Sequence, residues 1–287
     1  MGDSTARRPA SGRVARLIVT RPAAEAAHWV QALHAHGWPA HALPLIDIGE
    51  PASAEARAAL QGWRAAWQQV DALMFVSGAA VSHFFVAGAL AAPVLPVHTR
   101  FWAPGPGTAR QLAQALSVLG VSGEQIDAPA EDAAQFDSEH LWPVIAPQLR
   151  PGFRLLIVRG SSVDAPPAAG TVAGHGRDWL IRQCEAAGAR VDGCVAYERR
   201  APALDEGGRQ RIMDATKAGS LWLFSSSEAL AALQLLQPDA DWGSVTALAT
   251  HPRIAQAARA LGFGRVIESR PSLPDVLRAL ESERSAP

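Results

Sequence analysis

The stretch DALMFVSGAAV, residues 71–81, predicts a short buried strand that runs through a serine loop into a helix. The pattern F-x-S-x-x-A-aliphatic occurs again later, where Phe224 and Ser226 take the places of Phe75 and Ser77. Two further pairs of segments resemble each other, residues 16–22 with 154–160 and residues 100–112 with 247–258. A duplicated architecture is therefore the first expectation. Two similar half-sites that face each other would form the kind of cleft in which small-molecule ligands bind.

The composition of the chain fits two domains with ordinary hydrophobic cores. It has 287 residues, 48% of them hydrophobic, and a formal net charge of −1. This charge favours neither nucleic acid nor an anionic membrane as a partner. Cys184 and Cys194 are the only cysteines, and two scattered thiols are typical of a reducing compartment. No apolar run approaches the ~20 residues of a membrane span. We expect a cytoplasmic monomer whose residues 1–13 form a flexible tail.

Strand and helix patterns alternate along most of the chain. Continuous aliphatic runs such as residues 16–20 and 153–158 indicate strands buried on both faces. This alternation predicts an α/β fold of parallel sheets with helices on both faces, in which ligands bind beyond the carboxyl ends of the strands. The expected ends are Thr20, Ser77, Gly105, Arg159, Ser226 and Thr250. Pro44 lies within the extended residues 42–48, which favours a connection between bodies.

The usual signatures of catalysis are absent. The sequence contains no P-loop, no H-E-x-x-H and no G-x-S-x-G. Gly105-Pro106-Gly107 imitates a dinucleotide fingerprint, but Arg110 occupies the third glycine position. Four histidines cluster around one expected helix without a cysteine or carboxylate at matching spacing, so we predict no metal site; they are His28, His34, His36 and His41.

Small residues and arginines remain at the strand ends. Helix N-termini present free N–H groups and partial positive charge, which would suit a ligand with several carboxylates. Ser77 and Ser226 act either as N-caps alone or also as ligand contacts. Four arginines are either exposed side chains or bidentate carboxylate contacts; they are Arg21, Arg159, Arg177 and Arg253. Residues 161–176 form either a loop over the site or a simple insertion.

The order and spacing of several short motifs resemble those of the uroporphyrinogen-III synthase family. The resemblance runs from about Arg13 to Leu280, and no single motif is specific. The motifs are T-R-P after the first strand, Pro44-Leu45, F-V-S-x-x-A-V at Phe75, G-x-x-T-A at Gly105, L-I-V-R-G before Ser161, L-x-x-x-G-A-x-V ending at Val191, and V-x-x-Y-x-R around Tyr197.

The resemblance implies two flavodoxin-like parallel-sheet α/β domains joined by a two-stranded linker, with the first domain discontinuous. The first domain would comprise residues 14–43 and 200–284, and the second residues 46–195. The segments around Pro44 and Tyr197 would form the linker.

The resemblance also implies an activity, the cyclisation of the linear tetrapyrrole hydroxymethylbilane to uroporphyrinogen III with inversion of ring D and loss of water. No cofactor is expected. Tyr197 would be the general acid, and its alternative role is an aromatic packed at the hinge. The expected substrate-binding residues are Thr20, Arg21, Ser77, Gly105, Thr108, Arg159, Gly160, Arg177, Ser226, Thr250, His251 and Arg253. Arg253-Ile254 stands where relatives carry a threonine pair, so Arg253 would bind a carboxylate of the substrate instead. The alternative is a non-catalytic flavodoxin-like small-molecule binding or sensor protein.

Overall fold

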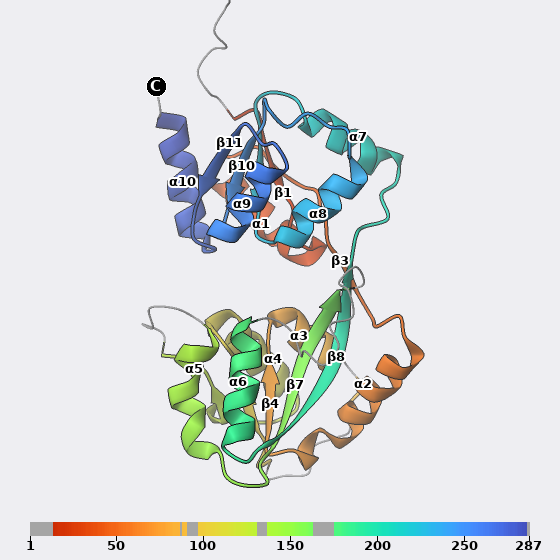
Figure 1. The fold of residues 1–287 in the computed structure, drawn as a ribbon, viewed down its shortest axis with the longest axis vertical. Coiled ribbons are helices and arrows are strands. Elements are labelled where there is room, and N and C mark those ends of the chain that lie inside the picture. The colour runs from red at the N-terminus through yellow and green to blue at the C-terminus, as the bar shows by residue number, and fades with distance from the viewer. Residues whose placement is uncertain (1–13, 87, 91–96, 131–136, 163–174, 286–287) are drawn as a thin grey trace, which may run out of the picture. The chain divides into compact units, whose positions relative to one another are not determined.

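The computed structural model describes residues 14–86, 88–90, 97–130, 137–162 and 175–285, and it describes the side chains of residues 175–177 no further than their place in a helix. The chain divides into two compact units (Figure 1). Unit 1 contains Met1–Asp47 and Arg200–Pro287, and unit 2 contains Ile48–Arg199. The chain therefore enters unit 1, leaves it to build unit 2, and returns.

Unit 1 is built on a five-stranded sheet in the order β11-β10-β9-β1-β2, and every neighbouring pair is parallel. Its elements are β1 (Arg16–Val19), α1 (Ala23–Ala35), β2 (Ala40–Ala42), α7 (Glu206–Ala215), β9 (Ser220–Phe224), α8 (Ser227–Leu236), β10 (Thr246–Ala249), α9 (Pro252–Ala260), β11 (Arg265–Glu268) and α10 (Leu273–Ser285).

The strands of unit 1 are buried on both faces. On one face, Leu17 and Leu223 pack with Leu33 of α1 and Leu280 of α10. On the other face, the Trp222 indole donates a hydrogen bond of 3.0 Å to the Ala215 carbonyl at the end of α7. Aliphatic and aromatic residues without alternation are what a sheet covered on both sides requires.

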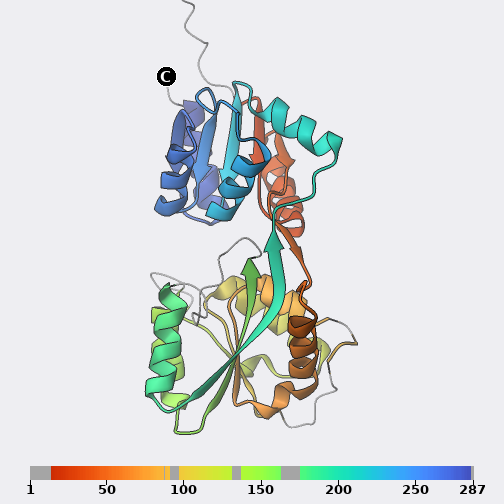
Figure 2. The same ribbon diagram turned by 45° about the vertical axis from the view of Figure 1, so that its right-hand side comes forward.

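Unit 2 contains a six-stranded sheet in the order β3-β8-β7-β4-β5-β6. Its elements are β3 (Asp47–Gly49), α2 (Ala54–Ala66), η1 (Trp67–Gln69), β4 (Ala72–Phe75), α3 (Gly78–Phe84), β5 (Arg100–Trp102), α4 (Pro106–Val118), η2 (Gly123–Gln125), β6 (Ile126–Asp127), α5 (Ser138–Ile145), η3 (Ala146–Gln148), β7 (Arg154–Ser162), α6 (His175–Ala186) and β8 (Arg190–Arg200). Figure 2 shows β7 and β8 as long neighbouring strands.

Two hydrophobic clusters fill unit 2, one on each face of its sheet. Leu156 and Val158 of β7 belong to the cluster with α2, α3 and α4. Leu155 and Ile157 belong to the cluster with α5 and α6. Alternate residues of the strand thus serve opposite faces, as the period of two in a β-strand requires.

The three repeated segment pairs occupy equivalent places in the two sheets. In unit 1 the order β2-β1-β9-β10-β11 runs across the sheet, and in unit 2 the order β8-β7-β4-β5-β6 does so. β1 therefore corresponds to β7, β9 to β4, and β10 to β5, which are the pairs that resemble each other in sequence. Chain connectivity differs, because β7 and β8 come last in unit 2 whereas β1 and β2 come first in unit 1.

Several predicted boundaries differ from the structure for local reasons. The predicted extended segment 42–48 contains only the end of β2 and the start of β3, and Pro44 lies in the gap between the two strands. The sequence after Ser77 predicts a helix to about Leu90, but α3 ends at Phe84. The predicted loop 161–176 begins two residues too early, since Ser161 and Ser162 belong to β7. Residues 163–174 of that loop lie outside the described residues.

Candidate active site

Ser77 lies where β4 gives way to α3 and makes two contacts with its hydroxyl group. Its Oγ caps α3 by accepting a hydrogen bond of 3.2 Å from the Ala80 N–H. The same Oγ lies 3.1 Å from the hydroxyl oxygen of Tyr197 on β8. Two of the sequence candidates, 120 residues apart, are therefore joined directly at the carboxyl end of a strand.

An irregularity in the pairing of β7 with β8 aims Tyr197 at Ser77. Arg159 pairs with Val195, but the next residue, Gly160, pairs with Tyr197, so Ala196 is an extra residue on β8. With strict alternation Ala196 and Tyr197 would face opposite sides of the sheet. The bulge instead lets both join the cluster on the α3 side. The motif V-x-x-Y carries no sign of this bulge.

Gly160 is the residue that makes room for the tyrosine ring. A β carbon placed on Gly160 would lie 2.3 Å from Cζ of Tyr197 and 2.4 Å from Cε2. No side chain larger than hydrogen fits there without moving the ring. Gly160 is itself buried, so its place in the structure is beneath Tyr197 and not on an open ligand surface.

Tyr197 is also well enclosed within unit 2. The residue is 4% exposed, belongs to the core of unit 2, and lies in a strand that pairs with β7 as far as Arg199. The residues around Tyr197, which were expected to form one strand of a two-stranded linker, belong to β8, and β8 lies between β3 and β7 in the sheet.

His83 of α3 packs beside Tyr197 and was not among the sequence candidates. The two ring centroids are 5.5 Å apart. Burial lowers the pKa of the His83 imidazole and the Arg64 charge lowers it further, whereas Glu50 acts in the opposite direction. Arg64 donates to the carbonyl oxygens of His83 and Phe84, which fixes the end of α3. His83 is therefore a neutral imidazole near pH 7 that packs beside the phenol of Tyr197.

The G-x-x-T-A loop lies next to the Ser77 loop through the packing of α4 on α3. Gly105 is the N-cap of α4, and Thr108 lies half-buried in its first turn. A β carbon on Gly78 would lie 2.1 Å from Oε1 of Gln111, so the Gln111 amide covers the start of α3. The α4 helix thus contributes a second N-terminus and a polar side chain close to Ser77.

Arg159 is a partly buried cation without a close partner among the described residues. Its Nε is buried and makes no hydrogen bond there. Burial lowers the pKa of its guanidinium group, and the charge of Asp178 on α6 partly offsets this. A desolvated cation of this kind is stabilised by an anion that can reach it. Arg159 therefore has the surroundings expected of a carboxylate contact.

Unit 1 repeats the capped loops but has no phenol. Ser226 caps α8 by accepting from the Glu228 N–H at 3.1 Å. His251 caps α9, since its Nδ1 accepts from the Arg253 N–H at 3.1 Å. The Arg253 side chain is exposed and follows directly on that cap. Tyr197 is the only tyrosine in the chain, so Ser226 has no equivalent of the Ser77 pair.

The remaining unit 1 candidates are committed to internal contacts. Thr20 is buried, and its hydroxyl donates to the Leu223 carbonyl at 2.8 Å. Thr250 is also buried, and its N–H donates to Phe224 at 3.1 Å. The Arg21 guanidinium pairs with Glu25 at 2.9 Å and lies 4.2 Å from the ring centroid of Trp29, although its Nε has no partner among the described residues. In unit 2, Arg177 lies on α6, and its side chain is outside the described residues.

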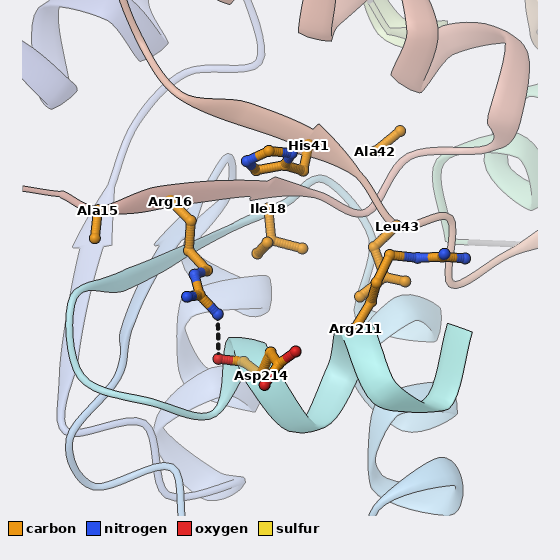
Figure 3. A pocket seen from close by; sticks show the side chains of 8 residues that line it. All are labelled: Ala15, Arg16, Ile18, His41, Ala42, Leu43, Arg211 and Asp214. Carbon is orange, nitrogen blue, oxygen red and sulfur yellow. Dashed lines mark hydrogen bonds between the residues drawn. The ribbon is translucent and has the colours of Figure 1, made fainter. Parts of the chain in front are cut away.

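A separate groove of about 350 Å³ lies on unit 1 and contains no predicted site residue (Figure 3). Arg16 and Ile18 of β1, His41 of β2, and Arg211 and Asp214 of α7 line it, with Ala15, Ala42 and Leu43. The Arg16 guanidinium donates to the Asp214 carbonyl oxygen, and Arg211 lies 3.9 Å from Asp205. The first contact joins α7 to β1 and the second lies within α7 and its N-cap, and together they account for the polar lining.

The described part of the chain offers neither a metal site nor a membrane span. Within it, no group of three or more His, Cys, Asp and Glu side chains is placed to hold a metal ion. Of the clustered histidines, His34 bonds the Ala40 carbonyl at 2.7 Å and His36 bonds the Ala32 carbonyl at 2.8 Å. None of the described helices combines the length and apolar character that crossing a bilayer requires.

The parallel sheets, the capped loops at their carboxyl edges and the part-buried Ser77–Tyr197 pair define a two-unit α/β protein. The chain belongs to the uroporphyrinogen-III synthase family, since the family model described as uroporphyrinogen-III synthase HemD matches residues 27–278. This finding favours the synthase interpretation over a binding or sensor protein.

Two solved structures that are similar to this chain bear the name of the same family. Uroporphyrinogen-III synthetase from Helicobacter pylori is 15% identical, with a TM-score of 0.54, over 93% of this chain and 98% of that one. A mutant uroporphyrinogen III synthase from Thermus thermophilus is 17% identical, with a TM-score of 0.49, over the same shares of the two chains. The parallel pairing within the two sheets and the likeness to the Helicobacter pylori structure confirm the predicted α/β class with parallel sheets.

Proposed function

We propose that the protein cyclises hydroxymethylbilane to uroporphyrinogen III with inversion of ring D and loss of water, without a cofactor. The observation that carries the proposal is the Ser77–Tyr197 pair, 3.1 Å apart at the carboxyl end of β4, in a chain of this family. The hydroxyl group of ring A needs a proton to leave as water. A phenol that is hydrogen-bonded to a serine hydroxyl at a strand end can supply this proton.

The other part of the proposed function is to hold the substrate in the reactive conformation. The substrate is a flexible chain with many carboxylates, and ring D has to react through a carbon that already carries a substituent. Holding the two ends together can lower a barrier by ~7–11 kcal/mol in the best cases. The capped helix N-termini and Arg159 in unit 2, with Arg253 in unit 1, suit carboxylates at points remote from the new bond.

The proposal includes the finer description of the fold. The strand order of unit 1, taken in chain order within the unit, is 2-1-3-4-5, and unit 2 has the same order after a circular permutation. This order is typical of flavodoxin-like sheets. We therefore propose two flavodoxin-like domains, residues 14–43 with 200–284 and residues 46–195, in a protein that acts as a cytoplasmic monomer.

Isomer analysis tests the proposed function. Purified protein, passed through a chelating resin and a desalting column, is mixed with freshly prepared hydroxymethylbilane. The products are oxidised and their isomers separated. We expect type III porphyrin at a rate that zinc, flavin and nicotinamide nucleotides do not change. A product with the isomer composition of the protein-free reaction would instead support the binding-protein alternative.

Removing a proposed carboxylate contact should weaken binding more than it slows turnover. We expect Arg159→Ala and Arg253→Ala each to raise KM by about 10- to 100-fold, the equivalent of one hydrogen bond to a charged group, with kcat nearly unchanged. The physical reason is that the contacted carboxylates are remote from the reacting atoms, so the interaction is the same in ground and transition states.

Arg190→Ala is the matched control for these two variants. Arg190 begins β8 at the opposite edge of the same sheet as Arg159, and its side chain is 76% exposed. Its KM should equal that of the wild-type protein. A large fall in kcat at saturating substrate with unchanged KM, in Arg159→Ala or Arg253→Ala, would show that the arginine does not act as a carboxylate contact.

A further inference from the structure

We infer that Ser77 is the hydroxyl group that meets the substrate, and that Tyr197 delivers its proton through Ser77. This inference rests on the proposed function and assigns roles within the pair. A phenol that acts as a general acid is ordinarily expected to contact the leaving group directly. The geometry around the two hydroxyl groups favours a relay for two independent reasons.

The first reason is the direction of the hydrogen bond. If Ser77 donated to Tyr197, the Tyr197 proton would need a second acceptor, and none of the described residues forms a second hydrogen bond with that hydroxyl. An O–H without an acceptor in a residue that is only 4% exposed is unfavourable. We therefore assign Tyr197 as the donor and Ser77 as the acceptor in this pair.

The hydrogen bonds that Ser77 Oγ accepts leave its own proton available for a further contact. A serine hydroxyl has two lone pairs and one proton. The Ala80 N–H donates to one lone pair at 3.2 Å, and the Tyr197 hydroxyl donates to the other at 3.1 Å. With both lone pairs occupied, the Ser77 hydroxyl can only donate in any further contact.

The second reason is exposure. Tyr197 is packed between Gly160 and His83 in the core of unit 2 and is 4% exposed. Ser77 is partly exposed and lies at the strand end, where the chain turns into α3. A molecule at this edge of the sheet reaches the Ser77 hydroxyl more readily than the Tyr197 hydroxyl.

The proposed step balances without any other reactant. The Ser77 O–H bond breaks as its proton joins the departing hydroxyl of ring A, which leaves as water and gives the azafulvene cation. The Tyr197 O–H bond breaks at the same time and restores the Ser77 hydroxyl. After ring closure, the proton that the macrocycle releases returns to Tyr197 along the same path.

Kinetics of single and double variants test the relay. We expect Ser77→Ala and Tyr197→Phe each to lower kcat by about tenfold or more. In the Ser77→Ala background, adding Tyr197→Phe should cost less than about twofold, because the two residues act as one unit. A further loss of about tenfold would mean that Tyr197 contacts the substrate directly, and it would overturn the inference.

Two other substitutions separate the hydroxyl from the helix cap. Ser77→Asp keeps an N-cap acceptor for α3 but has no proton to pass on near pH 7, so it should lose as much turnover as Ser77→Ala. Ser77→Thr keeps both functions and should stay within a few-fold of wild type. Ser53→Ala removes the cap of α2, where Ser53 Oγ accepts from the Ala56 N–H, and should leave turnover unchanged. Full activity in Ser77→Asp would contradict the relay.

A spectroscopic measurement decides the hydrogen bond without any activity. Because Tyr197 is the only tyrosine, protein labelled with ¹³C at tyrosine Cζ gives one resonance. Ser77→Ala should shift this resonance, whereas Ser226→Ala, which removes the corresponding cap of unit 1, should not. An unmoved resonance in Ser77→Ala would overturn the relay. Failure of the wild-type protein to form type III product would instead refute the proposed function and leave the spectroscopic result standing.

Discussion

Gly160→Ala is expected to reduce turnover by between about tenfold and a hundredfold while the protein stays folded. The added methyl group would lie 2.3 Å from Cζ of Tyr197, a distance at which the ring has to move. Movement of the ring breaks its 3.1 Å contact with Ser77 and removes the proposed proton source. Overpacking of this kind also costs about 1–3 kcal/mol of stability. Steady-state kinetics and urea unfolding of the purified variant measure the two effects.

Gly193→Ala is the matched control for Gly160→Ala. Gly193 lies on β8, opposite Ile157 of β7, and a β carbon there would contact nothing within 4 Å. This variant should keep wild-type turnover and lose little stability. If Gly160→Ala were as active as Gly193→Ala, the position of the Tyr197 ring could not matter to the reaction.

The two cysteines of the native protein are expected to react with a thiol reagent about a thousandfold more slowly than a free thiol. Cys184 and Cys194 are both free and buried, with exposed fractions of 0% and 1%. Burial raises the pKa of each thiol from 9.0 to about 12. A pKa that is three units higher reduces the fraction of reactive thiolate about a thousandfold. The limited access of the reagent to a buried thiol slows the reaction further.

Titration with 5,5′-dithiobis(2-nitrobenzoic acid) near pH 8, in the absence and presence of denaturant, measures this protection. The native protein should show almost no colour change over minutes, and two thiols should appear at once after unfolding. Cys184→Ser and Cys194→Ser variants assign the signals. Rapid reaction of one thiol in the native protein would mean that its surroundings open far more often than the packed clusters of unit 2 imply.

Most elements of the fold could be predicted because their patterns are local. The continuous apolar run Leu221–Phe224 is typical of a strand buried on both faces, and the structure confirms β9 at Ser220–Phe224. The repeated serine loops were enough to match two equivalent strands, β4 and β9, from the sequence. Two-residue β6 was missed, since Ile126–Asp127 is too short to carry a pattern.

The candidate site was predictable at its strand ends but not in its internal bonding. Ser77 and Tyr197 were both predicted, yet nothing in the sequence joined them, because the bulge at Ala196 that turns Tyr197 toward Ser77 depends on how β7 pairs with β8. Thr20 was expected to face a ligand, but its hydroxyl is used by the Leu223 carbonyl. Strand pairing and hydrogen-bond choice are long-range properties, so periodicity does not report them.

The structure also distinguishes the two half-sites that the repeat made look alike. Ser77 and Ser226 both cap helices after equivalent strands, but the phenol is found only beside Ser77. The proposed chemistry is therefore assigned to unit 2, whereas unit 1 has the capped helices without a phenol. A gene duplication followed by loss of symmetry would give such a division.

Cyclisation of the substrate is proposed to depend on positioning by the protein and on a proton that originates at Tyr197. The most direct test is the turnover of Tyr197→Phe together with the isomer composition of its product. This substitution keeps the ring over Gly160 and deletes only the hydroxyl. We expect kcat to fall by about tenfold or more and the product to remain type III, because positioning is intact. An unchanged kcat, or a product with the isomer composition of the protein-free reaction, would contradict the claim.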